Sequence, residues 1–292
     1  MTKLRQRMIE ELRLRNSSEE TIRSYIDSVK RFAQYYHTSP DRMNAEHVRS
    51  YLLYLLEERK LSWSAIQVNR AALRFLYVRV LRQRWFDEEI QAPKRRPQWP
   101  TVLSAEEITR ILDATRNLQH WTILATLYAT GVRCNELRLL KAEDIDSKRM
   151  LVHIRNGKGQ TPRDVNLSPV LLERLCIYWR WPKPKDWLFP SKQRPNRPME
   201  SKSIRHLCAN AGRRAGIQRH VHPHVFRHCF ATHLLDQGAD LRTIQGLLGH
   251  ADIRTTARYL RLSTRRIQAV ASPFDALAIQ PIDQSEDNAR QR

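Results

Sequence analysis

Three prolines interrupt the chain between residues 93 and 100 of its 292 residues. A proline has no amide donor and biases the residue before it away from helical backbone angles, so no regular element is expected to run through this stretch. Domains usually hold ~100–200 residues, and a chain of this length is comfortable for two. The sequence therefore predicts a first domain at 1–90 and a linker at 91–100. A second domain follows at 101–272, and a C-terminal tail at 273–292.

The first domain shows the period of amphipathic helices. Apolar side chains such as Ile22, Ile26 and Val29 recur at three- and four-residue steps, while basic side chains lie between them. Ser17, followed three residues later by Glu20, is typical of a capping box at a helix start. We therefore expect a small helical domain with basic outer faces.

The second domain also opens on a helix signal, because Ser104 and Glu107 have the spacing of a capping box. One stretch departs from the helical period. Apolar side chains alternate at 150–155 and again at 161–167, on either side of a turn with two glycines. This pattern predicts a β-hairpin. The expected fold class is mainly α with a small antiparallel β-sheet.

The charge balance points to a polyanionic partner. The chain carries 51 Lys and Arg against 30 Asp and Glu, a formal net charge of +21. Nucleic acid is the leading candidate, since cationic side chains release condensed counterions when they contact phosphates. No apolar run is long enough to span a bilayer, and the N-terminus lacks a signal peptide pattern, so we expect a cytoplasmic protein without a membrane partner. The four cysteines form no CxxC pair and predict neither disulfides nor a zinc ribbon.

Two segments of the second domain place single cations where they can meet an anion. In TGVRCNEL, Gly131 is suited to end a helix, and Arg133 falls near the start of the next one. The alternative is an ordinary helical ion pair between Arg133 and Glu136. In the hairpin turn, Lys158 stands between two glycines. A solvent-facing lysine is the simpler interpretation there, although a flexible tip can also deliver a proton donor into a groove.

A third segment, residues 220–228, is rich in histidine. Such density raises the hypothesis of a metal site, but no Asp, Glu or Cys stands at the spacing of a catalytic zinc centre, so no metal is expected. His224 and Arg227 lie three residues apart, which on a helix pairs a proton carrier with a fixed cation on one face.

The fourth segment, residues 240–262, predicts two short helices broken at Gly249 and His250. Tyr259 follows nine residues after His250 and is the final tyrosine of the chain. The alternative interpretation is a helix-turn-helix DNA reader, in which Tyr259 is a core or groove-facing aromatic residue.

Taken in this order, the segments resemble those of the tyrosine recombinase (phage integrase) family, and a Xer-like or mobile-element recombinase fits best. The resemblance covers nearly the whole chain, with the first domain similar to the family's helical, SAM-like core-binding domain and the second to its catalytic domain. The four segments hold five motifs of the family, around Arg133, Lys158, His224 with Arg227, His250, and Tyr259. Each motif alone is weak, but the five in this order are specific to the family. The catalytic positions that the resemblance implies are Arg133, Lys158, His224, Arg227, His250 and Tyr259.

The resemblance implies a site-specific DNA recombinase or integrase that cleaves and rejoins strands through a covalent 3′-phosphotyrosine. Two arginines would stabilise the charge of the transition state in place of metal ions, so neither a metal nor a cofactor is expected. The implied partners are double-stranded DNA with specific recombination sites and a homotetramer that holds two duplexes.

Two other function classes remain open at this stage. A helix-turn-helix regulator explains the charge and the last segment but gives Lys158 and His224 no purpose. A type IB topoisomerase shares the chemistry but acts as a monomer. The sequence reveals neither the target site nor the direction of the reaction.

Overall fold

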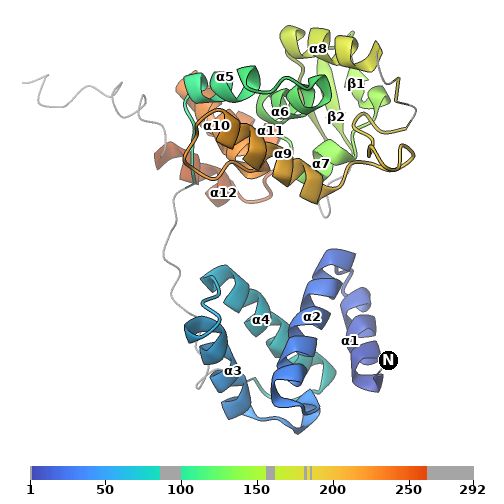
Figure 1. Ribbon diagram of the computed structural model, residues 1–292, viewed down its shortest axis with the longest axis vertical. Coiled ribbons are helices and arrows are strands. Elements are labelled where there is room, and N and C mark those ends of the chain that lie inside the picture. The colour runs from blue at the N-terminus through green and yellow to red at the C-terminus, as the bar shows by residue number, and fades with distance from the viewer. Residues whose placement is uncertain (1, 86–99, 156–161, 181–182, 185, 262–292) are drawn as a thin grey trace, which may run out of the picture. The chain divides into compact units, whose positions relative to one another are not determined.

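The computed structural model describes residues 2–85, 100–155, 162–180, 183–184 and 186–261 (Figure 1). The chain divides into two compact units, Met1–Pro97 and Gln98–Arg292. Nearly all of the linker proposed from the sequence, and the whole of the proposed tail, lie outside the described residues.

The described part of the N-terminal unit is helical. Its elements are α1 (Lys3–Leu14), α2 (Glu19–Tyr36), the 3₁₀ turn η1 (Pro40–Arg42), α3 (Ala45–Glu57), α4 (Trp63–Phe75) and the π-helical turn η2 (Leu76–Val80). Helices α2 and α4 pack side by side, and Phe32, Leu73 and Tyr77 are fully buried between the helices. The amphipathic period seen in the sequence therefore marks the face of each helix that enters this core.

The start of α2 differs by one residue from the sequence prediction. The N-cap is Ser18, whose hydroxyl oxygen accepts a hydrogen bond from the backbone amide of Thr21 at 3.1 Å. The predicted box of Ser17 and Glu20 is therefore wrong in register, because two adjacent serines offer the same capping chemistry and the sequence does not distinguish them.

The described part of the C-terminal unit is mainly helical with one small sheet (Figure 1). Its helices are α5 (Ala105–Asp113), α6 (Leu118–Thr130), α7 (Cys134–Arg138), α8 (Pro169–Arg180), α9 (Ser201–Arg214), α10 (Pro223–Asp236), α11 (Leu241–Leu248) and α12 (Ile253–Ala257). The 3₁₀ turns are η3 (Ala142–Asp144) and η4 (Arg258–Arg261). At the start of α5, Ser104 and Glu107 form the predicted capping box.

The sheet is antiparallel, in the order β1 (Ile145–Asp146), β2 (Leu151–Ile154) and β3 (Arg163–Asn166). Val152 pairs with Val165 across the hairpin, and both side chains are buried. The predicted hairpin and the predicted fold class are thus confirmed. Strand β1 was not predicted, since two residues are too short to show a period. The hairpin turn, with Lys158, lies outside the described residues.

Helix α6 forms the centre of the C-terminal unit, where it packs against α8 and α10. It ends at Gly131, which has a φ of +60°. A Cβ atom at this position would lie only 2.3 Å from a ring carbon of Phe230 on α10. Glycine is therefore required both for the left-handed turn and for the close approach of the two helices. That approach brings Arg133, after α6, close to Arg227 on α10.

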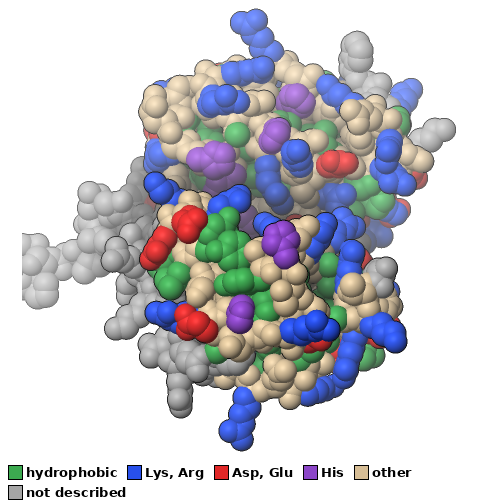
Figure 2. Space-filling view, turned by 60° about the horizontal axis from the view of Figure 1, so that its bottom comes forward, with side chains coloured by type: hydrophobic (Ala, Val, Ile, Leu, Met, Phe, Trp, Pro, Cys, Tyr) green, Lys and Arg blue, Asp and Glu red, His purple; other side chains and the backbone are tan. Residues whose placement is uncertain are grey.

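The face of the molecule shown in Figure 2 carries Lys and Arg side chains in blue across both units, with acidic side chains in red in the minority. Among the described residues, no helix is both long and apolar enough to cross a membrane.

Candidate active site

Arg133 lies between α6 and α7 and is the N-cap residue of α7. Its Nη1 donates to a carboxylate oxygen of Glu136 at 3.0 Å, and Nη1 and Nη2 also donate to the carbonyls of Leu248 and Gly249 at 3.3 and 3.4 Å. The predicted position at a helix start and the alternative ion pair with Glu136 are both present, and the binding of an anion stays a prediction. The ion pair directs the guanidinium of Arg133 toward the end of α11.

Glu136 is the centre of a buried ionic cluster. Its carboxylate, with 2% of the side chain exposed, accepts two hydrogen bonds from Arg163 on β3, at 3.0 and 2.7 Å. It also accepts from the backbone amide of Arg133 at 2.8 Å. Burial by itself would raise the pKa of Glu136, but the hydrogen bonds from Arg163 and Arg133 lower it to about 2. Glu136 therefore stays ionised and fixes Arg133 in place.

Arg163 connects this cluster to the end of α11. Its Nε donates to the carbonyl of Leu247 at 2.7 Å. Gly249 has a φ of +61°, and a Cβ atom there would lie 3.1 Å from the Arg163 side chain. Gly249 thus ends α11 in the left-handed conformation and, because it has no Cβ atom, also leaves room for the Arg163 side chain.

Arg227, on α10, is only 3% exposed. Its guanidinium donates to the carbonyls of Gly131 and Leu248, at 2.6 and 2.5 Å. Within the described part of the chain it forms no ion pair with a carboxylate. Burial and the nearby charge of Arg133 lower the pKa of Arg227 to about 9, which leaves it protonated at neutral pH. A buried cation held only by neutral carbonyls is suited to receive an anion from outside.

Tyr259 lies on η4 with 1% of its surface exposed. Its ring is nearly parallel to that of His250, with the centroids 6.5 Å apart. Burial raises the pKa of Tyr259, with the charge of Arg227 acting in the opposite direction, so the free hydroxyl is neutral. Tyr259 is therefore a core residue by packing, and its hydroxyl lies in the field of the arginines.

His250 follows the end of α11, and its Nδ1 lies 2.9 Å from the hydroxyl of Thr256. Partial burial, followed by the charge of Arg227, lowers the pKa of His250 to about 4. The imidazole is neutral at pH 7, so the hydrogen on one ring nitrogen is available to an anion while the other nitrogen contacts Thr256.

His224 lies exposed on α10, one turn before His228. The two rings are 6.5 Å apart, and the ring of His228 is 5.7 Å from that of Tyr259. The structure thus brings five predicted residues into one region: Arg133, His224, Arg227, His250 and Tyr259. Lys158 lies outside the described residues. Across the described ranges, no three His, Cys, Asp or Glu side chains are grouped so as to hold a metal ion.

Three residues of this site were not predicted from the sequence. Arg163 gave no signal, because a cation on a short strand is usually solvated. Glu136 was considered only as the partner of Arg133. His228 stood in the histidine-rich segment, and its spacing of four from His224 already placed both on one helical face.

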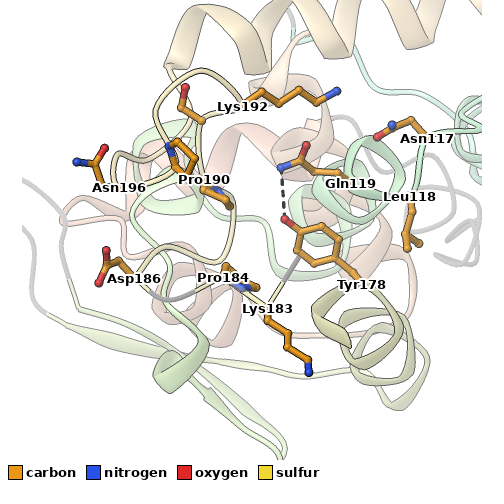
Figure 3. Close-up of a pocket in the computed structure, with 12 residues that line it drawn as sticks. Asn117, Leu118, Gln119, Tyr178, Lys183, Pro184, Asp186, Pro190, Lys192 and Asn196 are labelled. Atoms are coloured by element: carbon orange, nitrogen blue, oxygen red, sulfur yellow. Dashed lines mark hydrogen bonds between the residues drawn. The ribbon is translucent and has the colours of Figure 1, made fainter. Parts of the chain in front are cut away.

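A pocket of about 920 Å³ lies elsewhere, at the first turn of α6 (Figure 3). Gln119 donates to the hydroxyl of Tyr178 there at 3.3 Å, and the loop with Pro190 and Lys192 lies beside them. Helix α6 has 13 residues, so the pocket is about 20 Å from Gly131 and the arginines. None of the five predicted catalytic residues that the structure describes lines it. The pocket and the polar cluster are therefore separate features of the unit.

Comparison with known proteins identifies the class that this fold and site define. Residues 101–266 match the model of the phage integrase family, and residues 4–87 match that of the phage integrase N-terminal SAM-like domain. The chain therefore belongs to the phage integrase family, the tyrosine recombinases, which are site-specific DNA recombinases.

Individual relatives agree with this assignment. The y4qK protein of Sinorhizobium fredii is 44% identical over 278 residues, which cover 95% of this chain and 90% of the relative. Tyrosine recombinase XerA of Pyrococcus horikoshii is 31% identical over 266 residues, 88% of each chain. The crystal structure of a lambda integrase dimer bound to a core site matches with a TM-score of 0.73 at 16% identity, covering 96% of this chain and 99% of that one, which shows a shared fold.

Proposed function

We propose that this protein recombines DNA at specific sites, cutting and rejoining each strand through a 3′-phosphotyrosine at Tyr259. The observation that carries the proposal is the setting of Arg227, a buried cation held only by carbonyls among its described partners and close to both Arg133 and the tyrosine. Such a pair of guanidiniums fits the two nonbridging oxygens of a phosphodiester.

The reaction needs no external energy source. The Tyr259 oxygen forms a bond to phosphorus, the bond to the 5′ oxygen breaks, and the hydroxyl proton passes to a base, which the family resemblance assigns to His224. Lys158 supplies a proton to the departing 5′ oxygen, and His250 donates a hydrogen bond to the phosphate. Because the phosphotyrosine keeps the energy of the broken ester, a 5′ hydroxyl from another strand can reverse the step.

The proposed partner is double-stranded DNA that carries recombination sites. Residues 1–90 act as a DNA-binding core-binding domain, residues 91–100 as the linker and residues 101–272 as the catalytic domain. Four protomers hold two duplexes, and the protein acts in the cytoplasm. The net charge of +21 supports binding that is dominated by phosphate contacts.

The first experiment selects a bound sequence from a random duplex library and places it on two labelled duplexes. We expect strands to exchange between the duplexes, together with a protein–DNA adduct that survives denaturant and is digested by protease. Relaxation of supercoils without exchange would favour a topoisomerase, and binding without an adduct would favour a regulator.

Replacing Lys158 by alanine is expected to slow strand cleavage by about 10²-fold or more with little change in DNA affinity, because the loss falls on protonation of the leaving group. In a substrate with sulfur at the 5′ bridging position, the leaving group departs as a thiolate and does not need that proton. This substrate should restore most of the rate to the variant. A variant that stays equally slow on both substrates would show that Lys158 does not act as the acid.

A further inference from the structure

The Tyr259 hydroxyl has a partner that the proposed mechanism does not use. Nδ1 of His228 lies 3.0 Å from this oxygen, whereas His224 is the histidine that the family motif marks. His228 lies on the same face of α10, one turn farther on, and its ring is tilted against that of Tyr259 at 5.7 Å. The contact thus joins α10 to η4, the 3₁₀ turn that carries Tyr259.

The direction of this hydrogen bond follows from burial. Tyr259 is 1% exposed, and among the described residues His228 is the hydrogen-bond partner of its hydroxyl. If Nδ1 carried the hydrogen, the phenolic O–H would have no acceptor in the core, which is costly. The hydroxyl therefore donates to an unprotonated Nδ1, and the ring hydrogen of His228 sits on Nε2.

Other features of the site agree with a neutral His228. Partial burial, followed by the proximity of His224, lowers the pKa of His228 to about 4. Its Nε2 is not among the buried polar atoms that lack a partner in the described structure. The ring can thus hold the Nε2–H form at neutral pH without an unsatisfied donor.

We propose that His228 is a positioning residue for the nucleophile: before DNA binds, it fixes the Tyr259 hydroxyl through its proton, so that the oxygen lone pairs remain free for phosphorus. The proton passes to the base, His224, only when the oxygen attacks phosphorus. The inference rests on the proposed function in one respect, that Tyr259 is the nucleophile. A buried ring with a freely rotating hydroxyl would present the lone pairs in many directions. One hydrogen bond to Nδ1 restricts that rotation before DNA binds.

The first test measures the hydrogen bond itself in the DNA-free full-length protein. Long-range ¹H–¹⁵N NMR on ¹⁵N-histidine-labelled protein should show His228 as the Nε2–H tautomer, and in Tyr259→Phe its Nδ1 signal should shift toward that of a free acceptor. An Nδ1–H tautomer, or a signal that Tyr259→Phe leaves unchanged, would overturn the inference whatever the enzyme does to DNA.

The second test measures single-turnover formation of the protein–DNA adduct on a nicked suicide duplex. His228→Leu removes the acceptor and should slow the step about tenfold, the equivalent of one net hydrogen bond, with unchanged DNA affinity. His228→Asn should recover most of the rate, because an amide oxygen can occupy the place of Nδ1. An Asn variant as slow as the Leu variant, or a Leu variant as fast as wild type, contradicts the proposal.

His233→Leu is the matched control. His233 lies on the same helix, and its Nδ1 is 2.9 Å from the hydroxyl of Tyr128, so it forms the same kind of pair with a tyrosine that is not a predicted catalytic residue. We expect its adduct rate per folded molecule to equal that of wild type. If His233→Leu slows the reaction as much as His228→Leu, the effect is structural and the inference fails. If wild type forms no adduct at all, the proposed function fails instead, and the NMR result still decides the contact.

Discussion

Tyr259→Phe is expected to abolish the protein–DNA adduct, with a loss of more than about 10³-fold, while DNA binding persists. The substitution removes one oxygen and keeps the ring that packs in the core of the C-terminal unit. Loss of the contact with His228 should cost about 1 kcal/mol of folding free energy, too little to unfold a domain. The measurement is adduct formation on the nicked suicide duplex, with binding followed by gel shift.

Tyr128→Phe is the control for this change. It also removes a tyrosine hydroxyl that contacts a histidine, and Tyr128 lies on α6 of the same unit. Its adduct yield should match that of wild type. An undiminished adduct from Tyr259→Phe would mean that another residue is the nucleophile, and joint loss of binding and cleavage would make Tyr259 a structural residue.

Glu136→Gln is expected to destabilise the C-terminal unit by about 3 kcal/mol or more at pH 7. The side chain keeps its shape but loses the charge that Arg133 and Arg163 share, and removing one partner of a buried ionic cluster leaves the others uncompensated. Hydrogen exchange in α6, the central helix of the unit, measures the loss. Glu143→Gln, which removes the exposed partner of Arg155, should cost less than about 1 kcal/mol.

The pH dependence of this effect has a defined sign. The pKa of Glu136 is about 2 in the folded chain, below its ordinary value of 4.5, so the folded state favours the ionised form. This contribution, about 3 kcal/mol, is complete above pH 4.5 and is lost as the pH falls toward 2. The difference in stability between wild type and Glu136→Gln should narrow over that window. A constant difference would show that the charge is not its source.

The residues of the site were easier to predict from the sequence than the contacts that hold them in place. Arg227 and Tyr259 stand in short motifs with fixed spacing, and helix ends such as Gly131 and Ser104 are marked by local residue types. The partners of Arg133 at Leu248 and Gly249 are more than a hundred residues away in the chain. They are backbone carbonyls, which every residue carries, so no side-chain pattern reveals them.

Strand β1 and the contact between His228 and Tyr259 were also not predicted, because both depend on segments that are brought together only by folding. Strand β1 pairs only two residues with β2, so its existence depends on the neighbouring strand and not on its own sequence. The contact between His228 and Tyr259 joins two helical segments that the sequence marks separately, and only the packing of α10 against η4 brings them together.

The carboxyl end of α11 has a consequence for shortened copies of this protein. Carbonyls of Leu247, Leu248 and Gly249 receive hydrogen bonds from all three arginines, at the negative end of the helix. A copy that ends at residue 240 would keep Arg133, Arg163 and Arg227 and lose these acceptors together with Tyr259. If it folds, such a product would hold Arg133 and Arg163 through Glu136 and Arg227 through the Gly131 carbonyl, without the acceptors of α11. It would compete for the sites that the intact enzyme cuts. Loss of residues 241–292 would thus turn a folded copy into a competitor of the intact enzyme.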